Sequence, residues 1–251
     1  MKKMIARWML ALTVVLSMSA FFVARAFSIN LELVVFAVTA VTLIVAIAIE
    51  RWMPFDPHWN SRNGDFKTDA TSTVLLLAVV DPLLKAVAPL LVVLVYSIFA
   101  TRDTFTLFPE GSPYIVQLVV ATLLIELGRY WAHRWHHTNR FLWWLHAMHH
   151  SSERLYAVNN FRFHPLNYVV NFALSTFPLM LVGVPADVLF GYMALTQPVL
   201  MLQHANIDLR SGWLNYVFCT NELHRWHHSS DTKEANSNYG SALVVWDQVF
   251  G

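Results

Sequence analysis

Six long apolar stretches constrain the fold of this chain more than any other feature of its sequence. They cover residues 6–24, 31–49, 70–100, 114–131, 166–182 and 186–202. Each approaches the roughly 20 mostly apolar residues that an α-helix needs to cross a bilayer. Hydrophobic residues make up 56% of the chain and charged residues only 13%, which is too little charge to cover the surface of a soluble domain. The sequence therefore predicts an all-α integral membrane protein.

The third stretch is interrupted by charged residues and a proline. Asp81-Pro82 and Lys85 lie inside it, so it can form either one kinked span or a re-entrant pair of short helices. A neutralising pair between Asp81 and Lys85, four residues apart, explains these charges more simply than the lining of a substrate cavity does. The first stretch could also be a signal peptide that ends at Ala24-Arg-Ala26, but Arg25 is unusual in a cleavage site and favours an uncleaved span.

The distribution of basic residues predicts the orientation in the membrane. With 70–100 counted as one span and the N-terminus inside, the chain makes six crossings. The cytoplasmic segments then contain Lys2, Lys3, Arg7, Arg51, Arg62, Lys67, Arg134, Arg140, Arg154, Arg162, Arg210, Arg225 and Lys233. The opposite side has only Arg25 and Arg102 nearby, in agreement with the excess of positive charge on the cytoplasmic side of membrane proteins. The segments that contain His133–His137, His146–His150 and His224–His228 are therefore expected on the cytoplasmic face, which is that of the inner membrane if the protein is bacterial. A hairpin of two spans within 70–100 would place them on the opposite face, against this rule.

Nine of the twelve histidines occur in three segments with the pattern His-x-x-His-His. These segments are HRWHH at 133–137, HAMHH at 146–150 and HRWHH at 224–228. On a helix, residues three and four positions apart share a face, so the imidazoles of each segment are expected to point the same way. So many protonated imidazoles would repel one another, whereas a cation that accepts their lone pairs removes the conflict. The clustering predicts metal binding, in contrast to the ordinary structural or surface role of a lone histidine.

The number of histidines predicts two metal ions. A structural zinc site uses four ligands, and a catalytic site uses about three with water in the open position. The three segments, together with His204 at the end of the sixth apolar stretch, exceed what one ion can hold. Two ions with about four imidazoles each fit the count. Imidazole binds iron, zinc, copper and nickel alike, so the ligand type alone does not identify the metal.

The position of the histidine segments indicates a lipid substrate. They lie where apolar helices are expected to leave the bilayer, and oxidation of an unreactive C–H bond with O₂ requires iron or copper, because zinc has no redox chemistry. The eight glycines are never two residues apart, which excludes a Gly-x-Gly-x-x-Gly loop, and no P-loop occurs, so electrons are expected from an external donor. The net charge of +1 gives no reason to expect nucleic-acid binding, and Cys219, the single cysteine, cannot form an intrachain disulfide.

Six motifs in the second half of the chain form a specific set by their order and spacing. They are YWAHRWHH (130–137), HAMHHSS (146–152), RFHP (162–165), QHAN (203–206), HRWHHSS (224–230), and NYG (238–240) followed by WDQVFG (246–251). With these motifs the chain resembles the fatty acid hydroxylase/sterol desaturase superfamily of membrane non-haem di-iron enzymes. The resemblance extends from about Glu126 to the last residue. His136 is additional to the His-x-x-x-His pattern of the superfamily, and the chain stops at Gly251 where that pattern typically continues.

The resemblance implies four to six transmembrane helices and a cytoplasmic helical cap that holds two iron ions, with zinc also able to occupy the sites during purification. We expect an N-terminal transmembrane region (1–112) and a catalytic region (113–251) that act as one functional unit. The implied metal ligands, which are also the implied catalytic residues, are His133, His137, His146, His149, His150, His204, His224, His227 and His228. Members of the superfamily use O₂ to hydroxylate or desaturate fatty acyl chains, sterols, carotenoid rings or ether lipids. Their electrons come from cytochrome b5, ferredoxin or a reductase.

Several other residues have both a functional and a structural interpretation. Glu126 either accepts a hydrogen bond from a ligating histidine or pairs with Arg129. His164 is better explained as a structural or hydrogen-bonding histidine than as a ligand, and His58 as an exposed loop residue. Hydrogen bonding to the metal ligands and ordinary loop or cap interactions are both open for Asn206, Asp208, Asn238 and Asp247. An aromatic belt at the lipid headgroups explains the tryptophans near the histidine segments better than substrate stacking does; these are Trp131, Trp135, Trp143, Trp144, Trp213 and Trp226.

Two other functions stay open at the level of sequence. A metal transporter is expected to place its ligands near the middle of the bilayer, whereas these histidines follow the apolar stretches. A zinc hydrolase needs a carboxylate base beside the metal, and Glu153 or Glu222 could serve although no His-Glu-x-x-His motif occurs. The bound metal distinguishes these readings, because iron near two per chain supports oxygenation and zinc alone supports hydrolysis.

Overall fold

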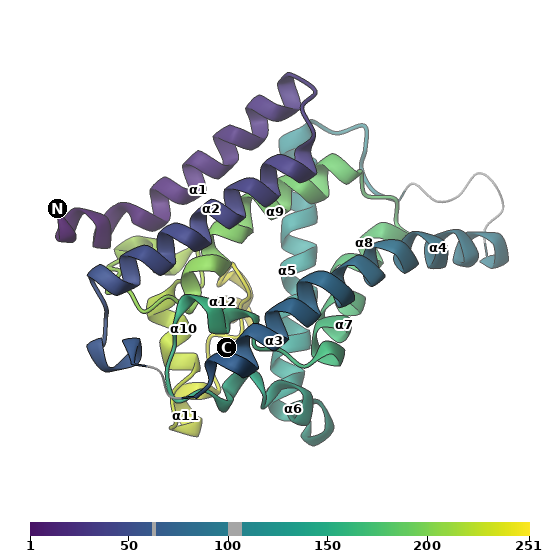
Figure 1. Ribbon diagram of the computed structural model, residues 1–251. Coiled ribbons are helices and arrows are strands. Elements are labelled where there is room, and N and C mark those ends of the chain that lie inside the picture. Colours follow the sequence, from purple (N-terminus) through teal and green to yellow (C-terminus); the bar gives the residue numbers. More distant parts are fainter. Residues whose placement is uncertain (62–63, 100–106) are drawn as a thin grey trace.

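The computed structural model describes residues 1–61, 64–99 and 107–251. Arg62 and Arg102, which contribute to the predicted orientation, lie outside these ranges. The described chain is all-helical, with two isolated β-bridges and no strand, which confirms the predicted fold class (Figure 1). The α-helices are α1 (Lys2–Ala26), α2 (Leu31–Trp52), α3 (Phe66–Leu75), α4 (Asp81–Phe99), α5 (Tyr114–Thr138), α6 (Arg140–His146), α7 (Pro165–Leu174), α8 (Thr176–Leu181), α9 (Ala186–Gln203), α10 (Asn221–His227), α11 (Thr232–Ala235) and α12 (Val245–Phe250). The 3₁₀ segments are η1 (Pro57–Asn60), η3 (His149–Ser151), η4 (Ala157–Phe161) and η5 (Gly212–Tyr216), and η2 (Leu76–Val80) is a π-helical turn.

Four helices of the described chain are long and apolar enough to cross a membrane. They are α1, α2, the continuous helix Phe66–Ile98 and α5. α1 and α2 run antiparallel and pack against α9, which also contacts α5 (Figure 1). The side chain of Asn30 caps α2 by accepting a hydrogen bond of 2.8 Å from the backbone N–H of Leu33, which defines where α2 begins after the turn from α1.

The third apolar stretch forms one continuous helix and not a re-entrant pair. α3 passes through the π-helical turn η2 directly into α4. Pro82 has no N–H, and its ring conflicts with the carbonyl of Ala78 four residues earlier, so the regular hydrogen-bond pattern is broken in the turn before it. Asp81 Oδ2 lies 3.1 Å from Lys85 Nζ, which confirms the predicted neutralising pair, and Lys85 Nζ also lies 3.1 Å from Glu32 Oε1.

Four of the six expected crossings are among the candidate spans of the described residues, which agrees with the lower end of the four to six transmembrane helices that the resemblance implies. Residues 166–182 form the two short helices α7 and α8, which meet at Ser175. Pro178 cannot donate a hydrogen bond to the carbonyl of Leu174, so the helix breaks there, and this carbonyl lies against Gly128 of α5. The last stretch forms α9, which has 18 residues, ten of them buried, and packs between other helices.

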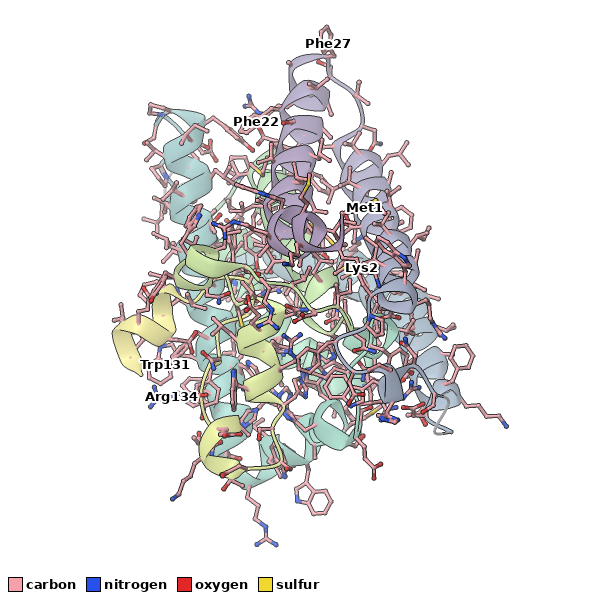
Figure 2. All side chains as sticks on the ribbon, turned by 90° about the vertical axis from the view of Figure 1, so that its left-hand side faces the viewer. Met1, Lys2, Phe22, Phe27, Trp131 and Arg134 are labelled. Atoms are coloured by element: carbon pink, nitrogen blue, oxygen red, sulfur yellow. The ribbon has the colours of Figure 1, made fainter. Side chains whose placement is uncertain are left out.

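The short helices α6, α10 and α11 lie toward one end of α5, whereas α7 and α8 lie alongside α5 (Figure 1). Phe22 and Phe27 lie toward the end of the molecule where α1 turns into α2, and Trp131 and Arg134 lie far from it, beside α12 (Figure 2). One apolar core joins the two halves of the sequence. Its buried members include Ala6, Leu10, Ala46, Val199, Leu202, Leu209 and Ala242. The N-terminal helices are therefore packed directly against the segment that carries the histidines.

Candidate metal centre

All nine histidines expected to be ligands gather in one region of the structure. α5 ends with His133 and His137, α6 ends at His146, and η3 supplies the two histidines that follow. His204 is the C-cap of α9, and α10 with its C-cap supplies the last three. The ring nitrogens fall into two groups in which all ligand atoms lie within 4.8 Å of one another. The first group is His133, His137, His146, His150 and His227, and the second group is His149, His204, His224 and His228.

Each of the last two histidine segments is divided between the groups. His146 and His150 enter the first group, whereas His149 enters the second. His224 and His228 enter the second group, whereas His227 enters the first. The expectation that all three imidazoles of a segment point the same way is wrong, because positions i+3 and i+4 differ by about 100° around a helix and lie on either side of position i. The two segments therefore tie the two groups together.

Within each group, the Nε2 atoms of different histidines approach one another closely. In the first group, His146 Nε2 lies 3.0 Å from His133 Nε2 and 3.2 Å from His150 Nε2. In the second group, His224 Nε2 lies 3.0 Å from His204 Nε2, and His228 Nε2 lies 3.2 Å from the Nε2 atoms of both His149 and His224. Metal–nitrogen bonds of about 2.1 Å at angles of roughly 90–110° place neighbouring nitrogens about 3.0–3.4 Å apart. The observed separations therefore match those around a bound ion.

Hydrogen bonds at the other ring nitrogen show which atom would bind the metal. Five Nδ1 atoms lie 2.8–3.3 Å from an oxygen: those of His133 (Tyr239 O), His146 (Asn167 Oδ1), His149 (Arg162 O), His204 (Asn159 Oδ1) and His227 (Ser237 O). A carbonyl oxygen can only accept, so Nδ1 carries the proton and Nε2 presents a lone pair. Two such lone pairs 3.0 Å apart repel each other unless a cation lies between them. The residues therefore fit a pair of metal ions.

Burial keeps these imidazoles neutral. The pKa of His227 falls from an ordinary value of 6.5 to about 3, because the ring is buried and lies beside His137. Burial, followed by the neighbouring histidines, also lowers the pKa of His146, His149, His150, His204, His224 and His228. A neutral imidazole is the form that binds a metal. The protein thus holds its ligands ready for a cation at neutral pH.

The sequence did not identify two asparagines that orient ligands. Asn159 in η4 donates from Nδ2 to Ser152 Oγ, at 3.2 Å, and to the carbonyl of Arg154, which fixes its Oδ1 toward His204. Asn167 in α7 is fully buried and accepts from His146 through Oδ1. Both follow the third histidine of the second segment by fewer than 20 residues, but neither lies at helical spacing from the ligand it contacts. Only the fold brings them together.

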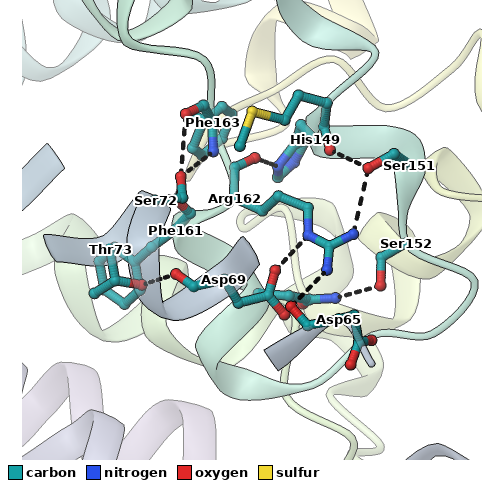
Figure 3. Close-up of polar contacts among 12 residues, drawn as sticks. Asp65, Asp69, Ser72, Thr73, His149, Ser151, Ser152, Phe161, Arg162 and Phe163 are labelled. Atoms are coloured by element: carbon teal, nitrogen blue, oxygen red, sulfur yellow. Dashed lines mark hydrogen bonds and ion pairs between the residues drawn. The ribbon is translucent and has the colours of Figure 1, made fainter. Parts of the chain in front are cut away.

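An ion pair near the membrane helices supports the second group. Arg162, whose carbonyl accepts from His149 Nδ1, extends its guanidinium to Asp69 of α3 and to Ser151 Oγ (Figure 3). Arg154 pairs with Asp65 at 2.7 Å and lowers the pKa of that carboxyl. Asp69 is fully buried, and Arg162 is only 4% exposed. The start of α3 is thereby bound to the chain that positions His149.

Other candidate residues have structural positions. Glu126 contacts neither a ligating histidine nor Arg129 within ion-pair distance; it accepts from the hydroxyl of Tyr192 (2.7 Å) and from two backbone N–H groups near the C-terminus, so both interpretations were wrong. His164 caps α7 by accepting from the N–H of Leu166, which confirms a structural role. None of Asn206, Asp208, Asn238 and Asp247 is hydrogen-bonded to a ligating histidine among the described residues. His58 is exposed.

His136 remains outside both groups. Its ring is fully buried, and Nδ1 lies 2.6 Å from the carbonyl of Ala132 one turn earlier on α5. The identical HRWHH sequences at 133–137 and 224–228 therefore have different roles at their fourth positions. His227 joins a metal group, whereas His136 is held by its own helix.

Replacing Asn167 with leucine is expected to weaken metal binding by about 10–100-fold. The change keeps the branched shape of the side chain but leaves the Nδ1–H of buried His146 without its acceptor. Metal retained per chain after dialysis against graded chelator measures the effect. Asn171→Leu, one turn further along α7, is the matched control because the Asn171 side chain donates to the carbonyl of Asn167 and, among the described residues, is hydrogen-bonded to no ligating histidine. Equal retention by the two variants would contradict this role of Asn167.

The part of the chain that contains the histidine groups is similar in sequence to known proteins. Residues 118–251, which contain all nine histidines, match the sequence model of the fatty acid hydroxylase family. An ornithine lipid hydroxylase of Rhizobium tropici, OlsE, is 35% identical over 229 residues, which cover 90% of this chain and 69% of that protein. Alkylglycerol monooxygenases of Homo sapiens and Danio rerio are each 28% identical, over 59% and 53% of this chain. The chain covers only 33% and 29% of their lengths. No solved structure matches it.

Proposed function

Since this chain belongs to the fatty acid hydroxylase family, we propose that it is a membrane lipid hydroxylase that uses two iron ions, O₂ and electrons from a separate donor protein. The single observation that carries the proposal is the pairing of Nε2 atoms at 3.0–3.2 Å in both groups while the opposite ring nitrogens donate to oxygen. Two bound iron ions would supply the redox chemistry that activates O₂. The nine histidines would hold these ions, and five of them, His146, His149, His204, His224 and His227, are buried.

The substrate proposed here is a membrane lipid. The first group lies at the end of α5, a candidate span, and an open apolar groove of about 410 Å³ on the same helix is lined by Gly128, Trp131, Trp135 and Leu174. An acyl chain fits such a surface by burial of apolar area. The similarity to an ornithine lipid hydroxylase over most of the chain makes an ornithine lipid the first compound to test. Hydroxylation is proposed ahead of desaturation for the same reason.

The proposed orientation places both histidine groups on the cytoplasmic face. Four spans with the N-terminus inside put the ends of α5, α6 and α10 on the side that carries most lysines and arginines. A cytoplasmic cytochrome b5, ferredoxin or reductase can reach this face. Fusion of a reporter enzyme to the C-terminus tests the orientation, and activity of a periplasmic reporter would contradict it.

The two competing functions have less support. The described metal groups consist of histidines alone; Glu153 is exposed, and Glu222 accepts from the backbone N–H of Ser211 at 2.6 Å. A hydrolase would thus lack a carboxylate base within either group. Transport requires ligands between broken helices near the middle of the bilayer. His133 and His137 instead lie in the last two turns of α5, and the other seven histidines of the two groups lie outside the candidate spans.

Metal analysis combined with lipid analysis tests the proposal. The purified protein is expected to contain iron near two per chain when it is produced with iron and without added zinc. Membrane lipids of cells that express it are expected to show a species heavier by one oxygen atom, which is missing from cells that express His149→Ala or His227→Ala. Zinc alone with hydrolysed lipid would favour the hydrolase, and unchanged lipids in the presence of O₂ and a working donor would refute the proposal.

A further inference from the structure

The peptide bond between Tyr239 and Gly240 links a carboxylate to a proposed metal ligand. On one side of this peptide, the carbonyl of Tyr239 accepts a hydrogen bond of 2.8 Å from His133 Nδ1. On the other side, the N–H of Gly240 donates to Asp247 Oδ2 at 2.9 Å. The N–H of Tyr239 donates to the second carboxylate oxygen, Oδ1, at 2.6 Å. The carboxylate of Asp247 thus accepts a hydrogen bond from the same peptide whose carbonyl oxygen accepts one from His133.

Gly240 and Asp247 are closely packed in this arrangement. A Cβ atom on Gly240 would lie 2.6 Å from Asp247 Oδ2 and 2.2 Å from the carbonyl oxygen of Leu243, so no larger residue fits there without displacing the carboxylate or the backbone. Asp247 stands in the first turn of α12, which fixes its side chain. Burial raises the pKa of Asp247 to about 6, yet the group stays mostly ionised at pH 7. The Asp247 carboxylate is therefore a charged acceptor of two hydrogen bonds.

The negative charge of Asp247 affects the imidazole of His133 through the peptide between them. An anion that accepts from a peptide N–H increases the negative charge on the carbonyl oxygen of the same peptide, because hydrogen bonds in a chain polarise one another. A stronger acceptor at Nδ1–H fixes the ring orientation and makes Nε2 a better donor to a metal. Histidines that bind metals commonly donate directly to a carboxylate. Here a peptide lies between the two groups.

We propose that Asp247 is a positioning residue for the first metal group, acting through the Tyr239–Gly240 peptide on His133. This inference rests on the proposed function, because it assumes that the first group binds a metal. It assigns a specific task to the WDQVFG segment, which contains no metal-binding histidine. The nearest ligating histidine in the sequence is His228, nearly 20 residues earlier.

A neighbouring carboxylate, that of the buried Glu126, provides a matched control. Glu126 Oε2 accepts from the N–H groups of Ala242 and Leu243, both at 2.8 Å, so it holds the same loop as Asp247 but not the peptide next to His133. In Glu126→Gln, the amide oxygen can still accept from both N–H groups while one negative charge is lost. In Asp247→Asn, one of the two N–H groups loses its acceptor and the same charge is lost. The two variants therefore differ in what happens to the Tyr239–Gly240 peptide.

The experiment measures iron retained by the full-length protein at increasing concentrations of a ferrous chelator under anaerobic conditions. Asp247→Asn is expected to release one of the two ions at roughly 10–100-fold lower chelator concentration, with the other ion unchanged. Glu126→Gln is expected to retain both ions as the original protein does. In a protein that already carries His133→Ala, Asp247→Asn is expected to have no further effect, because the ring through which it acts is missing.

Several outcomes would overturn the inference. Iron retention by Asp247→Asn equal to that of the original protein would do so, and so would equal weakening of both ions, since that pattern indicates general loosening of the cap. If Asp247→Asn does not fold, Asp247→Ser is measured instead, because water can enter beside the shorter side chain and satisfy both N–H groups; it should show the same selective loss. An original protein that binds no metal refutes the proposed function itself, which is distinguishable from a variant that retains both ions.

Discussion

Replacing His228 with alanine should abolish lipid hydroxylation and lower bound iron from two per chain toward one. His228 Nε2 lies 3.2 Å from the Nε2 atoms of both His149 and His224, so this ring borders the space that an ion in the second group would fill. Three imidazoles would remain in that group. Loss of a direct ligand should exceed the roughly 10–100-fold effect of removing an outer hydrogen-bond partner. We expect at least about a thousand-fold loss of activity, measured by mass spectrometry of the hydroxylated lipid.

The control for this variant is His58→Ala. His58 is exposed and belongs to neither metal group, so its removal changes the histidine content without touching the site. Both proteins should reach the membrane in similar amounts and unfold at similar temperatures without metal. Hydroxylation by His228→Ala within ten-fold of the control would show that the second group is not required for the reaction.

Replacing Gly128 with alanine should destabilise the protein by about 3 kcal/mol or more. A Cβ atom at this position would lie 2.1 Å from the carbonyl oxygen of Leu174 and 2.7 Å from Cα of Ser175. These are backbone atoms at the break between α7 and α8, so no flexible side chain can move aside and the helices must separate. The small gain that alanine normally brings within a helix, about 0.5–1 kcal/mol, cannot offset this overlap. The expected fall in melting temperature is roughly 6–12 °C, measured by thermal unfolding in detergent.

Gly111→Ala is the matched control for Gly128→Ala. It is the same chemical change at an exposed turn where a Cβ atom would meet no atom within 4 Å. Its effect should stay within about 0.5 kcal/mol. A melting temperature for Gly128→Ala as high as that of Gly111→Ala would mean that α5 and the α7–α8 break are not in close contact. Hydroxylation should fall with the folded fraction, because α7 also carries Asn167, which holds His146.

The sequence predicted that imidazoles would cluster better than it predicted how they are arranged and hydrogen-bonded. The segments that contain His133, His146 and His224 indicated a metal site, because so many protonated imidazoles close together would repel one another without a shared cation. The division of these imidazoles into two groups could not be predicted, because the i+3 members of the second and third segments, His149 and His227, lie in the other group once the segments face each other, whereas His136 of the first segment lies in neither group. Asn159 and Asn167 were missed for a related reason. Asparagines are common in loops and caps, and nothing in their spacing distinguishes these two.

The membrane spans were likewise predictable only in part. The stretches that became α1, α2 and α5 were recognisable because length and apolar content alone decide whether a helix can cross a bilayer. Residues 166–182 are also mostly apolar, but Pro178 breaks the helix that they could form. The last apolar stretch forms α9, which is buried by its neighbours. Hydropathy does not distinguish a helix that faces lipid from one that faces protein.

The sequence by itself determined that the chain is helical, that it contains helices long and apolar enough to cross a membrane and that most histidines are concentrated in three short segments, because these properties follow from local composition and spacing. Only the tertiary structure decided which imidazoles lie together, which oxygens orient them, and how Asp69, Glu126 and Asp247 hold the surrounding backbone. Those contacts join residues up to 117 positions apart, and contacts of that range depend on how the helices pack.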